Sequence, residues 1–320
     1  MKAPASRIVF AAVAIAVAMP SMAQEFPLTI EHKFGASTIE AKPVRVATID
    51  YNGADNLLAL GVQPVTIRYW FGGYDVWPWA EELLTSTPEV LRGDLNFEQI
   101  AAAEPDVIIA LYSGITDRDY QLLSAIAPVI AVPEGVGDYA LTWDDQALIA
   151  GRAIGMEQEA QAQVQAIGDA LAAIAERHPD WAGQTVTLGT IWEGASHVYT
   201  VSDPRVQFLN QMGLVNHPEV IALSQPGAFS VEVSEERPEA FDADVLIWFA
   251  DEGVEPIENA IFRPTLDAVK QGREVILGPL VTSALSHTSL LSLPYALDVL
   301  EPSIELAIDG DPATEVPIAP

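Results

Sequence analysis

Aromatic side chains and one arginine stand where the predicted strands of this sequence end. In open α/β sheets, ligands bind beyond the carboxyl ends of the strands. Aromatic walls with a few polar donors suit a bulky ligand that presents oxygen atoms. The candidate ligand-binding residues are Arg68, Tyr69, Trp70, Tyr112, Trp192, Tyr199, Phe229 and Trp248. For the last four, packing inside the protein is an equally good interpretation. Arg205 and Arg263 could reach an anionic ligand, but surface ion pairs are favoured in so acidic a chain.

A second pattern concerns two glutamates. Glu98 precedes Asp106 by eight positions, and Glu236 precedes Asp244 by the same distance. Each aspartate opens a continuous apolar run, which is typical of a buried parallel strand. Each glutamate falls near the start of a predicted short helix, where the helix dipole favours a carboxylate. Either glutamate alone would be an ordinary helix-start residue, but the matched pair indicates one equivalent position in each half of the chain.

The elements that must position these residues form two similar series. Strands of the first half are predicted at 44–49, 62–67, 106–111 and 129–132. Strands of the second half are predicted at 185–191, 244–249 and 273–277. Because helical patterns alternate with these strands, we expect an α/β fold with mainly parallel sheets. Residues 144–178 contain no proline and are rich in helix formers, which predicts one long helix joining two lobes. The expected units are an N-terminal α/β lobe over 24–143, a linking helix over 144–178 and a C-terminal α/β lobe over 179–320.

The composition narrows the class of protein. The chain has 320 residues, no Cys and a formal net charge of −30. So acidic a chain is a poor partner for nucleic acid or for an anionic membrane surface. Lys2, Arg7, the apolar run at 8–19 and the small residues around Met22 predict a cleavable signal peptide over 1–23. Because no Cys follows the run, we expect a periplasmic protein without a lipid anchor.

Several segments carry a resemblance to a known family. Residues 43–46 read PVRV, and residues 57–65 read LLALGVQPV. Residues 96–109 read NFEQIAAAEPDVII, and residues 112–128 read YSGITDRDYQLLSAIAP. Taken in order, with the joining helix, they resemble the substrate-binding proteins of ferric-siderophore and vitamin B12 ABC importers. The resemblance covers nearly the whole chain after the predicted signal peptide.

The resemblance implies a fold of two α/β lobes bridged by one long helix, with the ligand in the cleft between them. The implied ligand is a ferric siderophore, in which the chelator itself holds Fe(III), so we expect no cofactor and no protein metal ligands. The resemblance favours ligand contact for Arg68 and Tyr112. It also implies that Glu98 and Glu236 dock into basic pockets of an inner-membrane permease, with Glu235 as the alternative to Glu236. The protein is expected to be a monomer.

Other ligands and other classes of protein stay open at this stage. Cobalamin, haem or ferric citrate would suit the same scaffold, and hydroxamate, catecholate and carboxylate siderophores are not distinguished. Capture of free zinc or manganese is disfavoured because the five His residues are scattered. An exported α/β enzyme is a distant alternative, since the chain has no G-x-S-x-G, no H-E-x-x-H and no Cys nucleophile. We therefore expect a binding protein and not an enzyme.

Overall fold

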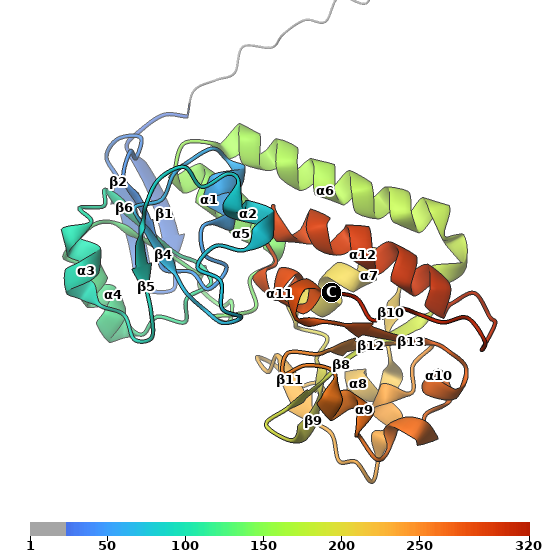
Figure 1. The fold of residues 1–320 in the computed structure, drawn as a ribbon. Coiled ribbons are helices and arrows are strands. Elements are labelled where there is room, and N and C mark those ends of the chain that lie inside the picture. The colour runs from blue at the N-terminus through green and yellow to red at the C-terminus, as the bar shows by residue number, and fades with distance from the viewer. Residues whose placement is uncertain (1–23) are drawn as a thin grey trace, which may run out of the picture.

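Two bodies, each built on its own sheet, make up the protein, and a long helix runs along both (Figure 1). The structure is a computed structural model that describes residues 24–320, so the signal peptide predicted over 1–23 lies outside the described residues. Among residues 24–320, no helix combines the length and the apolar character needed to cross a membrane.

The N-terminal sheet has five strands, all parallel, in the order β5-β4-β3-β6-β7. They are β3 (Val46–Thr48), β4 (Thr66–Arg68), β5 (Glu89–Leu91), β6 (Val107–Ala110) and β7 (Val129–Ala131). Strands β3, β6 and β7 are buried at every position, which is why they are continuous apolar runs in the sequence. The helices of this lobe are α1 (Asp55–Ala59), α2 (Pro78–Glu81), α3 (Phe97–Ala102) and α4 (Asp117–Ser124). A hairpin of β1 (Leu28–His32) and β2 (Gly35–Ile39) packs beside β7.

The C-terminal sheet has six strands of mixed direction. Its parallel strands are β8 (Thr185–Trp192), β10 (Val215–Asn216), β12 (Val245–Phe249) and β13 (Glu274–Leu277). Antiparallel strands β9 (Ala195–Tyr199) and β11 (Ser230–Glu232) form one edge. The short helices around it are α7 (Pro204–Asn210), α8 (Pro218–Leu223), α9 (Glu255–Glu258) and α10 (Asp267–Lys270), with 3₁₀ turns η2 (Pro238–Phe241) and η3 (Arg263–Thr265). The predicted fold class, with mainly parallel central sheets, is confirmed.

The helix predicted over 144–178 is two helices, which corrects its boundaries. α5 (Trp143–Ala153) ends where Gly155 adopts a φ of +70°, a left-handed conformation that glycine takes at little cost. α6 (Glu157–Arg177) then begins and packs back against α5. A Cβ at Gly151 would lie 2.4 Å from the Cβ of Ala160, so glycine permits this close approach. α5 packs on α1 in the N-terminal lobe, and α6 alone makes the bridge (Figure 1).

The bridging helix is 21 residues long, or about 30 Å at 1.5 Å per residue. It ends at the 3₁₀ turn η1 (Pro179–Trp181), which leads into β8. α12 (Ser292–Ala307) lies alongside it, after the buried helix α11 (Pro279–His287). Because two helices in contact resist bending better than one, the packing of α12 on α6 stiffens the bridge.

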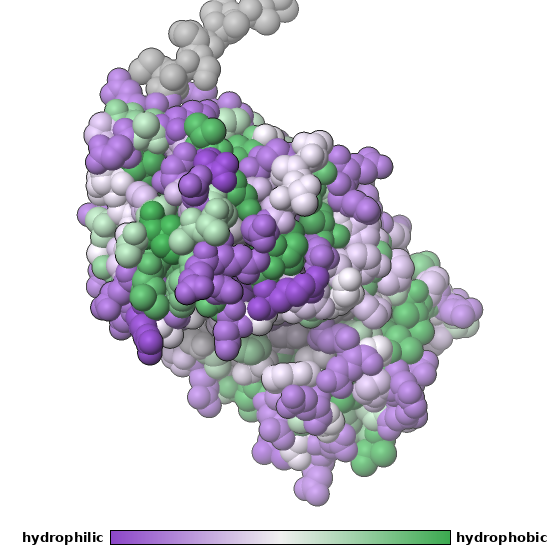
Figure 2. Space-filling view, turned by 60° about the vertical axis from the view of Figure 1, so that its left-hand side comes forward, coloured by the Kyte–Doolittle hydropathy of each residue, from purple (hydrophilic) through white to green (hydrophobic). Residues whose placement is uncertain are grey.

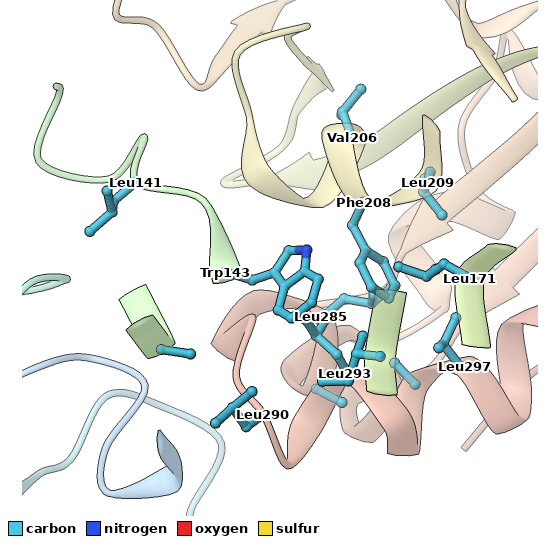
Figure 3. Close-up of a cluster of buried hydrophobic side chains, with 14 of the residues drawn as sticks. Leu141, Trp143, Leu171, Val206, Phe208, Leu209, Leu285, Leu290, Leu293 and Leu297 are labelled. Carbon is cyan, nitrogen blue, oxygen red and sulfur yellow. The ribbon is translucent and has the colours of Figure 1, made fainter. Parts of the chain in front are cut away.

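One hydrophobic core continues from lobe to lobe (Figure 3). Trp143, at the start of α5, packs edge-on against Phe208 of α7, with ring centroids 6.5 Å apart. Leu171 of α6, Leu285 of α11 and neighbouring leucines of α12 surround this pair. Separating the lobes would expose these side chains at a cost of about 1.5–3 kcal/mol for each large one. The lobes therefore hold a nearly fixed relative position.

Candidate functional site

The matched spacing in the two halves corresponds to a matched structure. The Asp106 carboxylate precedes β6 and accepts hydrogen bonds from the N–H groups of Val44 and Arg45, at 2.8 and 3.0 Å. The Asp244 carboxylate precedes β12 and accepts from the N–H and the hydroxyl of Thr185, at 2.8 and 2.7 Å. In each lobe the aspartate thus ties the start of one central strand to its parallel neighbour.

The two glutamates lie at corresponding positions before those strands, and both are exposed. Glu98 is in the first turn of α3, which Asn96 caps by accepting from the Gln99 N–H at 3.1 Å. Glu236 lies in a turn between β11 and η2, where its N–H donates to Ser234 Oγ at 3.3 Å. A single 3₁₀ turn replaces the helix expected in the second lobe, so a helix dipole favours only Glu98.

Arg68 lies at the carboxyl end of β4 among aromatic rings. Its guanidinium carbon is 4.1 Å from the centroid of the Tyr51 ring. Its N–H groups reach only backbone oxygens, those of Ile49 at 3.5 Å and Ser113 at 3.4 Å, which are long and weak contacts. No carboxylate of residues 24–320 forms an ion pair with it. The guanidinium therefore keeps most of its donor capacity.

Four rings form a connected wall beside this arginine. The rings of Tyr51 and Trp70 are 5.4 Å apart, those of Trp70 and Tyr112 are 6.0 Å apart, and those of Tyr112 and Tyr139 are 5.5 Å apart. Two of these residues, Trp70 and Tyr112, were sequence candidates. Tyr51 and Tyr139 were missed, although Tyr51 is the second residue after the first predicted strand, near the strand end at which ligand contacts gather.

A buried carboxyl group, that of Asp50, is hydrogen-bonded to the backbone of this aromatic wall. Asp50, which follows β3, accepts from the Tyr112 N–H at 2.8 Å. Burial raises its pKa to about 7, while the amide hydrogen bonds and the nearby charge of Arg68 act in the opposite direction. Sequence reasoning missed Asp50, and its position one residue after an apolar strand was the available signal.

The C-terminal lobe contributes a second arginine, whose situation differs. Arg205 begins α7, and its guanidinium lies 3.9 Å from the centroid of the Tyr199 ring. Asp203 accepts from Arg205 through both carboxylate oxygens, at 2.8 and 2.6 Å. The Arg205 side chain also donates to Ser286 Oγ of α11 at 3.4 Å. A surface ion pair was expected for Arg205, but its pair with Asp203 is buried and bidentate.

Tyr112 brings the two lobes together at this point. Burial raises the pKa of its hydroxyl to about 12, and the nearby charge of Arg205 lowers it in part. Tyr112 of one lobe therefore lies close to Arg205 of the other, whose guanidinium stacks on the Tyr199 ring. We call the space bounded by Arg68, the aromatic wall, Arg205 and Tyr199 the recess. A space-filling view shows a shadowed hollow between the two lobes (Figure 2).

The other candidates are dispersed. Trp248 has no exposed surface, stacks on Phe241 and donates from Nε1 to Glu274 at 2.7 Å, so it is a core residue and not a ligand contact. The Tyr69 ring lies under the Arg92 guanidinium, whose central carbon is 4.4 Å from the ring centroid. Trp192, at the tip of the β8–β9 hairpin, is 51% exposed, and Phe229, just before β11, is 49% exposed. Neither packs against the aromatic wall.

A second aromatic cluster joins the lobes at His287, the last residue of α11. Its ring lies 5.3–5.6 Å from the rings of Trp70, Trp77 and Trp79. Its Nδ1–H donates to the Ser283 carbonyl at 2.8 Å, and burial lowers its pKa to about 4. The imidazole is therefore neutral, and it packs among these tryptophan rings of the N-terminal lobe.

Buried hydrogen bonds continue this junction along α1. Asp55 accepts from Trp79 Nε1 at 2.8 Å and from Ser289 Oγ at 2.7 Å. Asn56 accepts from the Leu290 N–H at 3.0 Å. The contacts to Ser289 and Leu290 connect residues 234 positions apart, and no sequence pattern indicated them. They fix the loop between α11 and α12 to the N-terminal lobe.

Two hollows lie elsewhere. A groove of about 420 Å³ runs between α6 and α12 and is lined largely by apolar side chains such as Ile167 and Leu297. A second hollow, of about 540 Å³, lies beside Glu232 and Glu235. Neither combines an aromatic wall with an unpaired donor as the recess does. Residues 24–320 contain no group of three or more His, Asp or Glu side chains arranged to hold a metal ion.

The chain matches the periplasmic binding protein family over residues 46–279. The probable siderophore-binding lipoprotein YfiY of Bacillus subtilis is 27% identical over 242 residues, which cover 72% of this chain and 71% of the relative. The Fe(3+) dicitrate-binding periplasmic protein FecB of Escherichia coli is 29% identical over 201 residues, or 62% of this chain and 64% of FecB. The structure of PiaA from Streptococcus pneumoniae in complex with ferrichrome is 30% identical with a TM-score of 0.74, covering 88% of this chain and 99% of PiaA. These matches confirm the resemblance inferred from the sequence motifs.

Proposed function

Because the chain belongs to the periplasmic binding protein family, we propose that it captures a ferric siderophore in the recess and delivers it to an ABC importer. The observation that carries this proposal is the unpaired guanidinium of Arg68, which stands beside the wall of Tyr51, Trp70, Tyr112 and Tyr139. Its N–H groups are free to donate to the oxygen atoms that surround the iron.

The chelator, and not the protein, holds the metal in this mechanism. The iron of a siderophore complex is already coordinated by oxygen atoms, so the protein must recognise the outer surface of the complex. Aromatic rings cover its apolar parts, and Arg68 orients it through hydrogen bonds. Tyr199, across the recess, completes the contact surface. A binding role, with no chemical step, accounts for every residue of this site.

The stiffness of the bridge suits such capture. The shared core around Trp143 and the junction at His287 limit how far the lobes can move apart. The recess is therefore largely formed before the ligand arrives, and closure around it is small. A preformed site loses less conformational entropy on binding than a mobile one.

Delivery is proposed to use Glu98 and Glu236, one on each lobe. Both carboxylates are exposed and precede equivalent strands, so a two-lobed permease could contact both at once. Charges at such a surface mainly orient the encounter and speed it. The protein acts as a monomer in the periplasm, after removal of a signal peptide over residues 1–23.

Isothermal titration of the purified protein with ferrichrome, ferric dicitrate, a ferric triscatecholate, cobalamin and haem tests the proposal. We expect saturable binding of at least one ferric chelate and none of cobalamin or haem. Binding of cobalamin or haem alone would replace the proposed ligand by another on the same scaffold. Saturable binding of none of the five would refute capture in the recess.

A further inference from the structure

The charged groups around the recess are nearly balanced before any ligand binds. Two guanidinium groups, those of Arg68 and Arg205, lie against rings that bound it, Tyr51 and Tyr199. Three carboxyl groups accompany them: Asp203 is paired with Arg205, Asp50 lies beneath Arg68, and Asp251 follows β12. At most one positive charge, that of Arg68, is therefore left uncompensated, in a chain whose formal net charge is −30.

Arg205 cannot supply a free positive charge. Both oxygens of Asp203 hold its guanidinium, and its outer face is covered by the Tyr199 ring. The charge of Asp251 also acts on it, and the Asp251 carboxylate accepts from Thr190 Oγ1 at 3.2 Å. An anionic ligand that approached this lobe would meet a compensated pair, with a second carboxylate close by.

Arg68 is the guanidinium at the recess whose N–H groups have no carboxylate partner. A guanidinium can donate two parallel hydrogen bonds to a pair of adjacent oxygens. A hydroxamate group bound to Fe(III) presents such a pair, and three hydroxamates neutralise the ion's charge of 3+. The rest of the wall consists of rings, which favour an uncharged surface over a solvated anion because an unpaired charge is costly to desolvate.

Resting on the proposed function, we infer that the recess selects an electroneutral ferric chelate of the trishydroxamate class over polyanionic carboxylate or catecholate complexes. One hydroxamate oxygen pair lies against Arg68 and the remaining surface against the rings. Selection works because a polyanion would meet one uncompensated cation at most, so it depends on what the site withholds as much as on what it offers.

Titration of the purified wild-type protein with three ferric complexes tests this inference. The probes are ferrichrome as the uncharged trishydroxamate, ferric dicitrate, and a ferric triscatecholate. We expect ferrichrome to bind at least about tenfold more tightly than either anion, with an affinity nearly independent of salt between about 0.05 and 0.5 M. Tighter binding of either anion would overturn the inference and leave the proposed function intact, whereas no binding of any probe would defeat the proposed function itself.

A variant that uncovers Arg205 gives a sharper test. Asp203→Asn keeps an amide oxygen for the guanidinium and removes the neutralising charge. We expect the ratio of ferric dicitrate to ferrichrome dissociation constants to fall by about tenfold, because an uncompensated cation then faces the recess. Asp251→Asn should lower the ratio in the same direction, and it provides the test if Asp203→Asn does not fold.

Asp267→Asn is the matched control, since it makes the same charge change at an exposed residue paired with Lys270. The ratio should stay at the wild-type value in this variant. An unchanged ratio in folded Asp203→Asn and in Asp251→Asn, or an equal fall in Asp267→Asn, would contradict selection by the charges of the recess.

Discussion

Arg68 and Arg205 have the same side chain, lie against tyrosine rings at similar distances and stand on opposite sides of one recess, yet their partners differ. Arg68 contacts two backbone oxygens at 3.4–3.5 Å and no carboxylate, whereas both oxygens of Asp203 hold Arg205 at 2.6–2.8 Å. Arg205, which is paired with a carboxylate of the protein, has a structural role. Arg68, which has no such partner, keeps N–H groups that a ligand can use. Position at a strand end therefore does not assign a role by itself, and the partner does.

The largest expected effect separates the two arginines by stability. Arg205→Ala would leave the Asp203 carboxylate buried without its partner, so unfolding free energy should fall by about 3–5 kcal/mol. Arg68→Ala removes only long hydrogen bonds and one ring contact, so its loss should stay within about 1 kcal/mol. Urea unfolding followed by tryptophan fluorescence measures both. Equal losses in the two variants would remove the distinction.

The second effect concerns Asp50, the buried carboxyl group on which the charge of Arg68 acts. Its pKa is raised from 3.8 to about 7 in the folded protein, so folding holds the proton and stability falls as the pH rises from about 4 to 7. Asp50→Asn keeps an oxygen acceptor for the Tyr112 N–H and no longer titrates. It should be more stable than the wild type at pH 8, by at most about 4 kcal/mol.

At pH 4 the Asp50→Asn variant and the wild type should unfold at similar urea concentrations. His287 has the opposite slope, since its lowered pKa costs stability as the pH falls from 6.5 towards 4. It is present in both proteins and cancels in their difference. A wild type that is the more stable of the two at pH 8 would show that ionised Asp50 is favourable, through Arg68.

The third effect is on affinity and follows from the open guanidinium. Arg68→Ala should weaken chelate binding by about 1.5–3 kcal/mol, or roughly ten- to a hundredfold, because a charged donor is lost. Arg92→Ala is the control, since the Arg92 guanidinium already lies over the Tyr69 ring and pairs with Asp75. Isothermal titration should detect the loss in the first variant only. Unchanged affinity in Arg68→Ala would remove Arg68 from the ligand surface.

The smallest effect on the isolated protein is expected at the two docking positions. Glu98→Gln combined with Glu236→Gln should leave chelate affinity at the wild-type value, because both residues lie away from the recess. Uptake of radioactive iron chelate by cells that express the variant should fall severalfold. Glu239→Gln, an exposed neighbour, is the control. Normal uptake by the double variant would refute docking through these carboxylates, and Glu235→Gln would be the next test.

The sequence predicted the repeated parts of the molecule well, because strand burial and the Asp106 and Asp244 positions depend on local patterns. Arg68, Trp70 and Tyr112 were candidates because they lie within three residues of a predicted strand end, and the structure places them near one another. The sequence predicted one helix over 144–178 because the segment is rich in helix-forming residues and a glycine alone does not end a helix. The break at Gly155, which has a left-handed conformation, is favoured by the packing of α5 on α6, a tertiary contact. For Trp248 the sequence left ligand contact and packing equally open, because a strand-end position does not reveal which face of the sheet is covered; its side chain is fully buried.

The sequence by itself determined the two-lobed α/β architecture, the acidity of the surface and the equivalent positions of Glu98 and Glu236, since each is written in local order and composition. Only the tertiary structure decided which arginine is free and how the lobes are joined. His287 meets Trp77 across more than 200 residues, and Arg205 donates to Ser286, which is 81 positions further along the chain. Such neighbours are chosen by how the chain packs in three dimensions, so no pattern along the chain encodes them.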